Sequence, residues 1–175
     1  MKRAVLISLL ATTVLSNMIV SAQNRGKAWW PQFRGPNSAG LGEGTPPVHF
    51  GPAQNVRWKT PVGPGLSSPI VWEERIFLTE FDKAGKQLST LCIDRRTGKI
   101  LWRKTVSPKQ IEEVHEISSP AGSTPVTDGE RVYVYFGSYG LIAYDFNGNQ
   151  KWERQLDGFH DRWQKHRPIP FVGPP

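Results

Sequence analysis

Short runs of alternating apolar and polar residues follow one another along the chain from residue 55 onward. The 17 Gly and 15 Pro fall largely between short apolar runs, a distribution typical of strands joined by turns rather than of long helices. One group of strands is predicted at 67–72, 75–81, 87–94 and 99–104. Only 108–116 has the composition of a short helical turn or acidic loop.

The same order of elements recurs in the second half of the chain. Ser123-Thr124-Pro125-Val126 repeats the start of the first group, and apolar runs follow at 131–136 and 141–145, with a last strand at 150–154. Asp128-Gly129 and Asn147-Gly148 are turn dipeptides between these runs. The pattern therefore predicts two copies of one four-stranded antiparallel unit.

A tryptophan closes each unit. Trp58, Trp102 and Trp152 recur every 44 to 50 residues, a period that is typical of β-propeller blades. A two-sheet sandwich has a similar strand spacing, but the repeated Trp after a glycine turn favours the propeller. The predicted fold class is all-β: an incomplete β-propeller with about two four-stranded antiparallel blades and an N-terminal extended arm, fewer than the roughly four to eight blades of a closed ring.

The chain divides into five predicted segments. Residues 1–22 read as a signal peptide, with a basic start, an apolar run and small residues before Gln23. Ser16-Asn17 interrupt the apolar run below the roughly 20 residues of a membrane span. The remaining segments are an extended arm with one strand at 55–60, two blades and an irregular tail: 23–64, 66–106, 122–156 and 157–175.

Charge and cysteine content narrow the choice of partners. The net charge is +7, but Lys and Arg are scattered without a run, which indicates a solvated basic surface and no nucleic-acid partner. Cys92 is the one cysteine, so no intramolecular disulfide forms, and its apolar neighbours predict a buried thiol. We expect a product exported to the periplasm or the cell exterior, with no membrane anchor after signal cleavage.

Cys92 to Trp102 resembles the tryptophan-docking motif of pyrroloquinoline quinone (PQQ) repeat propellers, Ala-x-Asp-x-x-Thr-Gly-Lys-x-x-Trp. Only Cys92 departs from it, and Ala143 to Trp152 is a variant one residue shorter that lacks the Thr. Trp30 to Pro36 also resembles the mature N-terminus of exported quinoprotein-like proteins. In that family the Trp stacks on the neighbouring blade near its turn glycine, and the resemblance assigns these roles to Trp102 and Gly98.

The family includes both PQQ-dependent dehydrogenases and outer-membrane assembly lipoproteins that bind protein partners, so fold alone does not choose an activity. A dehydrogenase would need a Ca²⁺ site of converging oxygen ligands, a catalytic Asp and, in many members, a vicinal disulfide, which one cysteine excludes. Asp94 and Asp145 lie at turn positions, where a carboxylate typically accepts local backbone hydrogen bonds.

The histidines form no ligand pattern. His160-Asp161 and His166 lie close in sequence, but the intervening basic residues would repel a cation, and His49 and His115 are isolated. No catalytic, cofactor-binding or metal-binding residue is predicted, and no cofactor is expected unless a dehydrogenase activity brings PQQ and Ca²⁺.

The sequence therefore predicts a non-enzymatic protein-interaction or scaffold module, whose partner is another protein or further copies of the chain that complete the ring. After Leu156 neither alternation nor a turn continues, which suggests a truncated form of a longer propeller. Two alternatives remain: the N-terminal part of a PQQ-dependent dehydrogenase, and a carbohydrate-binding module that uses Trp29, Trp30 and the blade aromatics.

Overall fold

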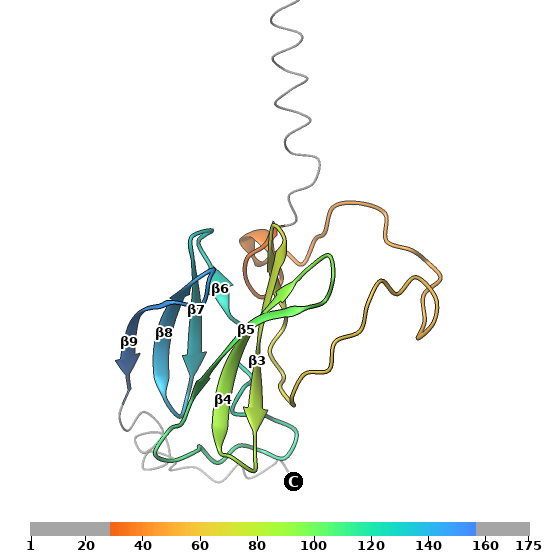
Figure 1. Ribbon diagram of the computed structural model, residues 1–175. Helices are drawn as coiled ribbons and strands as arrows, with labels where there is room; N and C mark the ends of the chain where they lie inside the picture. Colours follow the sequence, from red (N-terminus) through yellow and green to blue (C-terminus); the bar gives the residue numbers. More distant parts are fainter. Residues whose placement is uncertain (1–28, 157–175) are drawn as a thin grey trace, which may run out of the picture.

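The computed structural model describes residues 29–156, and the predicted signal peptide and tail lie outside this range. Two antiparallel sheets stand side by side (Figure 1). Sheet 1 has the order β1-β2-β3-β4-β5 and sheet 2 the order β6-β7-β8-β9. Sheet 1 comprises β1 (Trp29–Trp30), β2 (Ile70–Trp72), β3 (Arg75–Asp82), β4 (Gln87–Asp94) and β5 (Ile100–Val106). Sheet 2 comprises β6 (Val126–Thr127), β7 (Arg131–Phe136), β8 (Gly140–Asp145) and β9 (Gln150–Gln155).

One 3-10 turn, η1 (Pro36–Ser38), is the sole helical element within residues 29–156. None of the helices in this range is long and apolar enough to cross a bilayer. The segment 108–116, which the sequence leaves as a helical turn or a loop, is a loop.

The two sheets repeat each other in register. In sheet 1 Phe77 lies opposite Cys92, which lies opposite Trp102. Sheet 2 has the same row, formed by Tyr133, Ala143 and Trp152. Each sheet shifts register once, directly after Cys92 and after Ala143 respectively. The predicted repeat is confirmed, and residues 29–156 form two blades of an incomplete β-propeller.

The principal hydrophobic core lies between the two sheets. Phe77 packs against Phe146, with ring centroids 5.3 Å apart, and Trp102 packs against Tyr144 at 5.8 Å. These side chains join apolar residues from both sheets and the loop between them. The buried members of this cluster are Ile70, Phe77, Leu88, Cys92, Ala121, Val132, Val134, Phe136, Ile142 and Tyr144.

Trp102 locks the two sheets together at their rim. Its indole N–H donates to the backbone carbonyl of Phe146 at 2.9 Å. Its ring covers Gly148, whose φ of 83° lies in the left-handed region. A Cβ at Gly148 would approach the Trp102 ring to 2.9 Å, so only glycine fits beneath the indole without displacement.

Trp58 docks on sheet 1 in the same way. Its indole N–H donates to the carbonyl of Arg95 at 2.9 Å, and a Cβ at Gly98 would lie 2.5 Å from its ring. Gly98 has a φ of 75°, close to that of Gly148. Each acceptor carbonyl belongs to the residue after the turn aspartate, so the two contacts are structurally equivalent.

The prediction of a strand at 55–60 is wrong. These residues join no sheet within the described chain. Instead, side chains fasten the segment to the turn of sheet 1: Trp58 covers Gly98, and the Thr60 hydroxyl donates to the Gly98 carbonyl at 2.5 Å. The alternation of polar and apolar residues reflects this one-sided contact rather than ladder pairing.

The arm also forms a short strand that its sequence does not predict. β1 pairs with β2, and Trp29 stacks on Trp72 with ring centroids 5.2 Å apart and planes 2° from parallel. The carbonyl of Pro31 accepts the Thr127 N–H at 2.9 Å. The arm therefore contacts β2 of sheet 1 and β6 of sheet 2.

We predict that Gly148→Ala destabilises the fold by about 2 to 4 kcal/mol, because it adds left-handed backbone strain and displaces the docked indole. Gly44→Ala is the matched control, since Gly44 also has positive φ but has no atom within 4 Å of a Cβ. Its cost should stay near the ~1 to 2 kcal/mol of backbone strain alone. Urea denaturation measures both, and equal losses would contradict the docking interpretation.

Candidate interaction surface

Sheet 2 has one face packed in the core and one face without a neighbouring sheet in the described chain. Val132 and Val134 point into the core, so Tyr133, between them on β7, points to the opposite face. Tyr133 contacts Trp152 there, with ring centroids 6.0 Å apart. We call this surface the open face and define it by one row of residues with two flanking arginines: Arg131, Tyr133, Ala143, Trp152 and Arg154.

Trp152 is the most distinctive residue of the open face. It occupies the position in sheet 2 that Trp102 occupies in sheet 1, because it lies opposite Ala143 as Trp102 lies opposite Cys92. Its exposed fraction is 43%, and β9 is exposed along its whole length. Among the glycines of residues 29–156, none has its Cβ position against Trp152. Trp152 thus stands in the position of a docking tryptophan, but no glycine turn of residues 29–156 lies beneath its ring.

The far face of sheet 1 is covered by the arm. Leu91 and Ile93 are buried there, outside the cluster between the sheets. Glu80 is only 8% exposed and accepts the Gly63 N–H at 2.7 Å, while it pairs with Arg103 at 2.6 Å. A cavity of about 390 Å³ remains at the arm, lined by Asn55, Val56, Arg57, Trp58, Ile76 and Arg95. The arm therefore covers the face of sheet 1 that a neighbouring blade would cover in a closed propeller.

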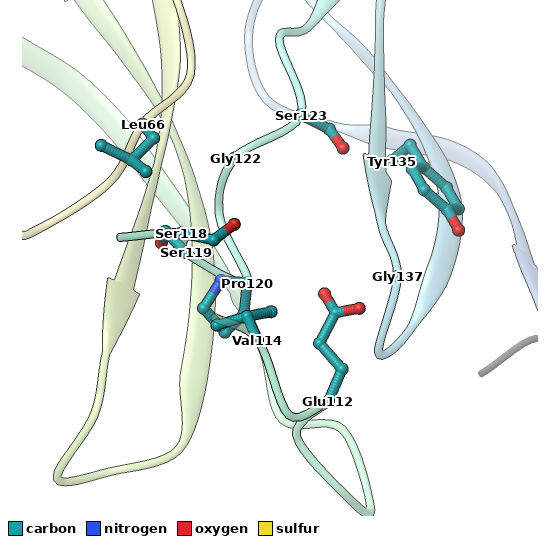
Figure 2. Close-up of a pocket in the computed structure, with 10 residues that line it drawn as sticks. All are labelled: Leu66, Glu112, Val114, Ser118, Ser119, Pro120, Gly122, Ser123, Tyr135 and Gly137. Carbon is teal, nitrogen blue, oxygen red and sulfur yellow. The ribbon is translucent and has the colours of Figure 1, made fainter. Parts of the chain in front are cut away.

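A groove of about 550 Å³ lies where the loop between β5 and β6 passes β7. Glu112 extends its carboxylate from this loop toward β7 (Figure 2). The backbone N–H of Glu112 donates to Ser138 Oγ at 2.9 Å. Burial, and then the charge of Glu112, raise the pKa of Tyr135. The lining residues are Leu66, Glu112, Val114, Ser118, Ser119, Pro120, Gly122, Ser123, Tyr135 and Gly137.

The groove does not fit the calcium and quinone site of a PQQ-dependent dehydrogenase. Calcium takes six to eight oxygen ligands, from carboxylates, backbone or amide carbonyls and water. The groove is lined by one carboxylate, that of Glu112, and nowhere in residues 29–156 do three His, Cys, Asp or Glu side chains form a group that could hold a metal ion.

The two turn aspartates brace the turns on which the indoles dock. Asp94 Oδ1 accepts the backbone N–H of Thr97 and its hydroxyl, both at 2.7 Å. Asp145 pairs with Lys151 at 2.9 Å and accepts the Asn149 N–H at 2.9 Å. The Thr97 bonds lower the pKa of Asp94, and Lys151 followed by Asn149 lowers that of Asp145.

Asp128 braces a different turn, the one between β6 and β7. Its burial opposes ionisation, but hydrogen bonds from Tyr133, Arg131 and Glu130 outweigh this effect and lower its pKa to about 2. Gly129 in this turn has a φ of 95°, and a Cβ there would approach the Trp72 ring to 2.6 Å. This further indole contact between the sheets was missed from sequence, although the Asp-Gly dipeptide marks its turn.

The remaining sequence candidates are not brought together. His49 lies in the arm and His115 in the loop between β5 and β6, whereas His160, Asp161 and His166 lie outside the described residues. Cys92 is fully buried, and burial raises the pKa of its thiol to about 11. The thiol is therefore protonated at neutral pH and sits in the core.

We predict that stability declines below about pH 4, as Asp145 begins to take up protons in the unfolded chain. The folded-state pKa lies below the unfolded value, so the stabilisation is present above the unfolded pKa and is lost as pH falls through the folded one. The Asp145→Asn variant should be less stable than the wild type at pH 7, and it should lose less stability than the wild type between pH 4 and pH 2. Urea midpoints at pH 7, 4 and 2 measure this. Glu43→Gln, in the exposed arm, is the control, and parallel profiles for Asp145→Asn and wild type would contradict the prediction.

Comparison with known proteins bears on the family. No curated protein matches the chain. A solved europium-containing methanol dehydrogenase is 21% identical over 57% of this chain and 19% of its own, with a TM-score of 0.37, so the present chain spans about a fifth of that enzyme's length. The model of the PQQ-repeat family described as outer membrane protein assembly factor BamB matches residues 51–162. This match covers both blades and both docking turns, and the chain therefore belongs to that PQQ-repeat family.

Proposed function

We propose that the chain is an exported, non-enzymatic protein-interaction or scaffold module that binds its partner through the open face of sheet 2. One observation carries the proposal: Trp152 stands in the docking register of Trp102 but is 43% exposed. Tyr133 supports its ring from one side, so the indole is held in place for a partner. Arg131 and Arg154 add hydrogen-bond donors beside it.

The energetics favour a protein partner. An indole buries roughly 150 to 250 Å² when it is fully covered, and 43% of Trp152 is exposed, so covering the remainder at about 25 cal/mol per Å² amounts to roughly 2 to 3 kcal/mol. Large aromatic anchors of this kind are frequent hot spots of protein interfaces. The internal contacts define what the partner must offer: a turn with a glycine in the left-handed region and a free carbonyl two or three residues before it.

Export and a role in the cell envelope are part of the proposal. Export rests on the basic and apolar pattern of residues 1–22. The matching family is described as an outer membrane protein assembly factor, which supports a role in protein assembly rather than in catalysis.

The dehydrogenase alternative has a direct test. The full chain, incubated with PQQ and Ca²⁺ and supplied with alcohols or sugars, should give no dye reduction above a protein-free control, because the groove has one carboxylate and residues 29–156 hold no group of three acidic, His or Cys side chains for a metal ion. Substrate-dependent turnover would overturn the non-enzymatic assignment. The carbohydrate alternative stays a prediction; one face of Trp29 is already stacked on Trp72.

Site-specific photocrosslinking tests the interaction surface. The chain is expressed in a cell that exports it, with a benzophenone amino acid in place of Arg154. Irradiation should then give discrete covalent adducts with the bound partner protein. The same residue in place of Lys83, in the exposed β3–β4 turn, is the matched control and should give few. Adducts that are no stronger at position 154 than at position 83 would refute binding through the open face.

A further inference from the structure

The two surfaces that flank the sheet pair are complementary. The open face carries Tyr133, Ala143 and Trp152, which correspond by register to Phe77, Cys92 and Trp102 of the core face of sheet 1. The far face of sheet 1 carries Ile76, Leu91 and Ile93. These correspond to residues on the core face of sheet 2: Val132, Ile142 and Tyr144. Sheet 2 of one molecule and sheet 1 of another therefore present the two halves of the interface that joins the sheets within one chain.

The Gly98 turn already binds an indole within the chain. Trp58 occupies it with the same hydrogen bond and the same glycine contact that Trp102 makes at Gly148. The residue two positions after each indole also reaches its turn: Thr60 donates to the Gly98 carbonyl, and Lys104 packs against Gly148. Arg154 holds this position relative to Trp152, and its guanidinium provides donors for the same carbonyl.

The arm that fills the Gly98 turn has few attachments. Residues 40–50 are exposed throughout, and between 51 and 62 only Gly51, Trp58 and Thr60 are half-buried. Side-chain bonds from Trp58 and Thr60, and the Gly63 bond to Glu80, hold this part of the arm to sheet 1. Because the arm belongs to the same chain, it competes at a high effective concentration with any outside indole.

We propose that the partner of the open face is a second copy of this chain, whose Gly98 turn receives Trp152 after Trp58 leaves it. The arm thus acts as an internal competitor that limits head-to-tail association. Such a contact uses different surfaces on the two molecules, so successive copies form either a closed ring or an open chain. This inference rests on the proposed function, since it names the occupant of the same open face.

Opposite effects of two tryptophan substitutions test the inference. Sedimentation of the full mature chain across a concentration series should show weak self-association in the wild type. Trp58→Ala, which vacates the turn, should tighten association at least tenfold, whereas Trp152→Ala and the double variant should remain monomeric. Phe50→Ala removes an arm side chain that is 78% exposed and should behave as wild type. Association of Trp58→Ala no tighter than wild type would overturn the proposal.

Two further measurements keep the inference testable if Trp58→Ala does not fold. Thr60→Val keeps the indole and removes one arm hydrogen bond, so it should tighten association in the same direction as Trp58→Ala but less. A synthetic peptide of residues 51–64 should inhibit the association of the Trp58→Ala and Thr60→Val chains. The same peptide with Trp58→Ala should not inhibit it. Lack of inhibition by the wild-type peptide would also overturn the proposal.

The crosslinking experiment separates the two levels of inference. Adducts of twice the chain mass at position 154 support self-association. Adducts of another mass alone would overturn self-association while they leave a protein-interaction role intact. The absence of both kinds of adduct would overturn self-association and the proposed protein-interaction role together.

Discussion

The contact of an indole with a left-handed glycine turn is the constraint on which this structure depends. The turn must lack a Cβ, because the ring lies where that atom would be, and it must offer a carbonyl to the indole N–H. Gly98 and Gly148 meet both requirements, with φ values of 75° and 83°. The aspartate at the start of each turn holds the carbonyl in place through hydrogen bonds to the following residues. Side-chain docking and turn geometry therefore depend on each other.

A propeller blade has two apolar faces, and in a closed ring both are covered by neighbours. In the described chain each sheet has one face against the other sheet. The arm covers the second face of sheet 1 and inserts Trp58 where a preceding blade would insert its tryptophan. No equivalent segment of residues 29–156 covers Trp152. This asymmetry, rather than any cluster of reactive groups, directs attention to binding.

The strands and turns of both blades were largely predictable, because period-two alternation and turn dipeptides are local properties of the chain. The tryptophan spacing correctly indicated equivalent closing strands for Trp102 and Trp152, whereas Trp58 makes the equivalent docking contact from a segment that joins no sheet. The strand expected at 55–60 was wrong, since alternation indicates a one-sided contact but does not say whether a backbone or only side chains make it. β1 was missed for the converse reason: Trp29–Trp30 pair with β2 without any alternating pattern of their own.

By itself, the sequence determined the class of the fold and the repeated four-stranded unit, because these follow from the short-range preferences of alternating residues and turn dipeptides. The docking roles of the tryptophan and the turn glycine came from the resemblance to the PQQ-repeat family. The tertiary structure decided which indole meets which turn: Trp58 meets Gly98 and Trp102 meets Gly148. It also decided that Trp152 has no glycine turn against it in residues 29–156. Such pairings depend on contacts between residues some 40 positions apart, which local sequence does not encode.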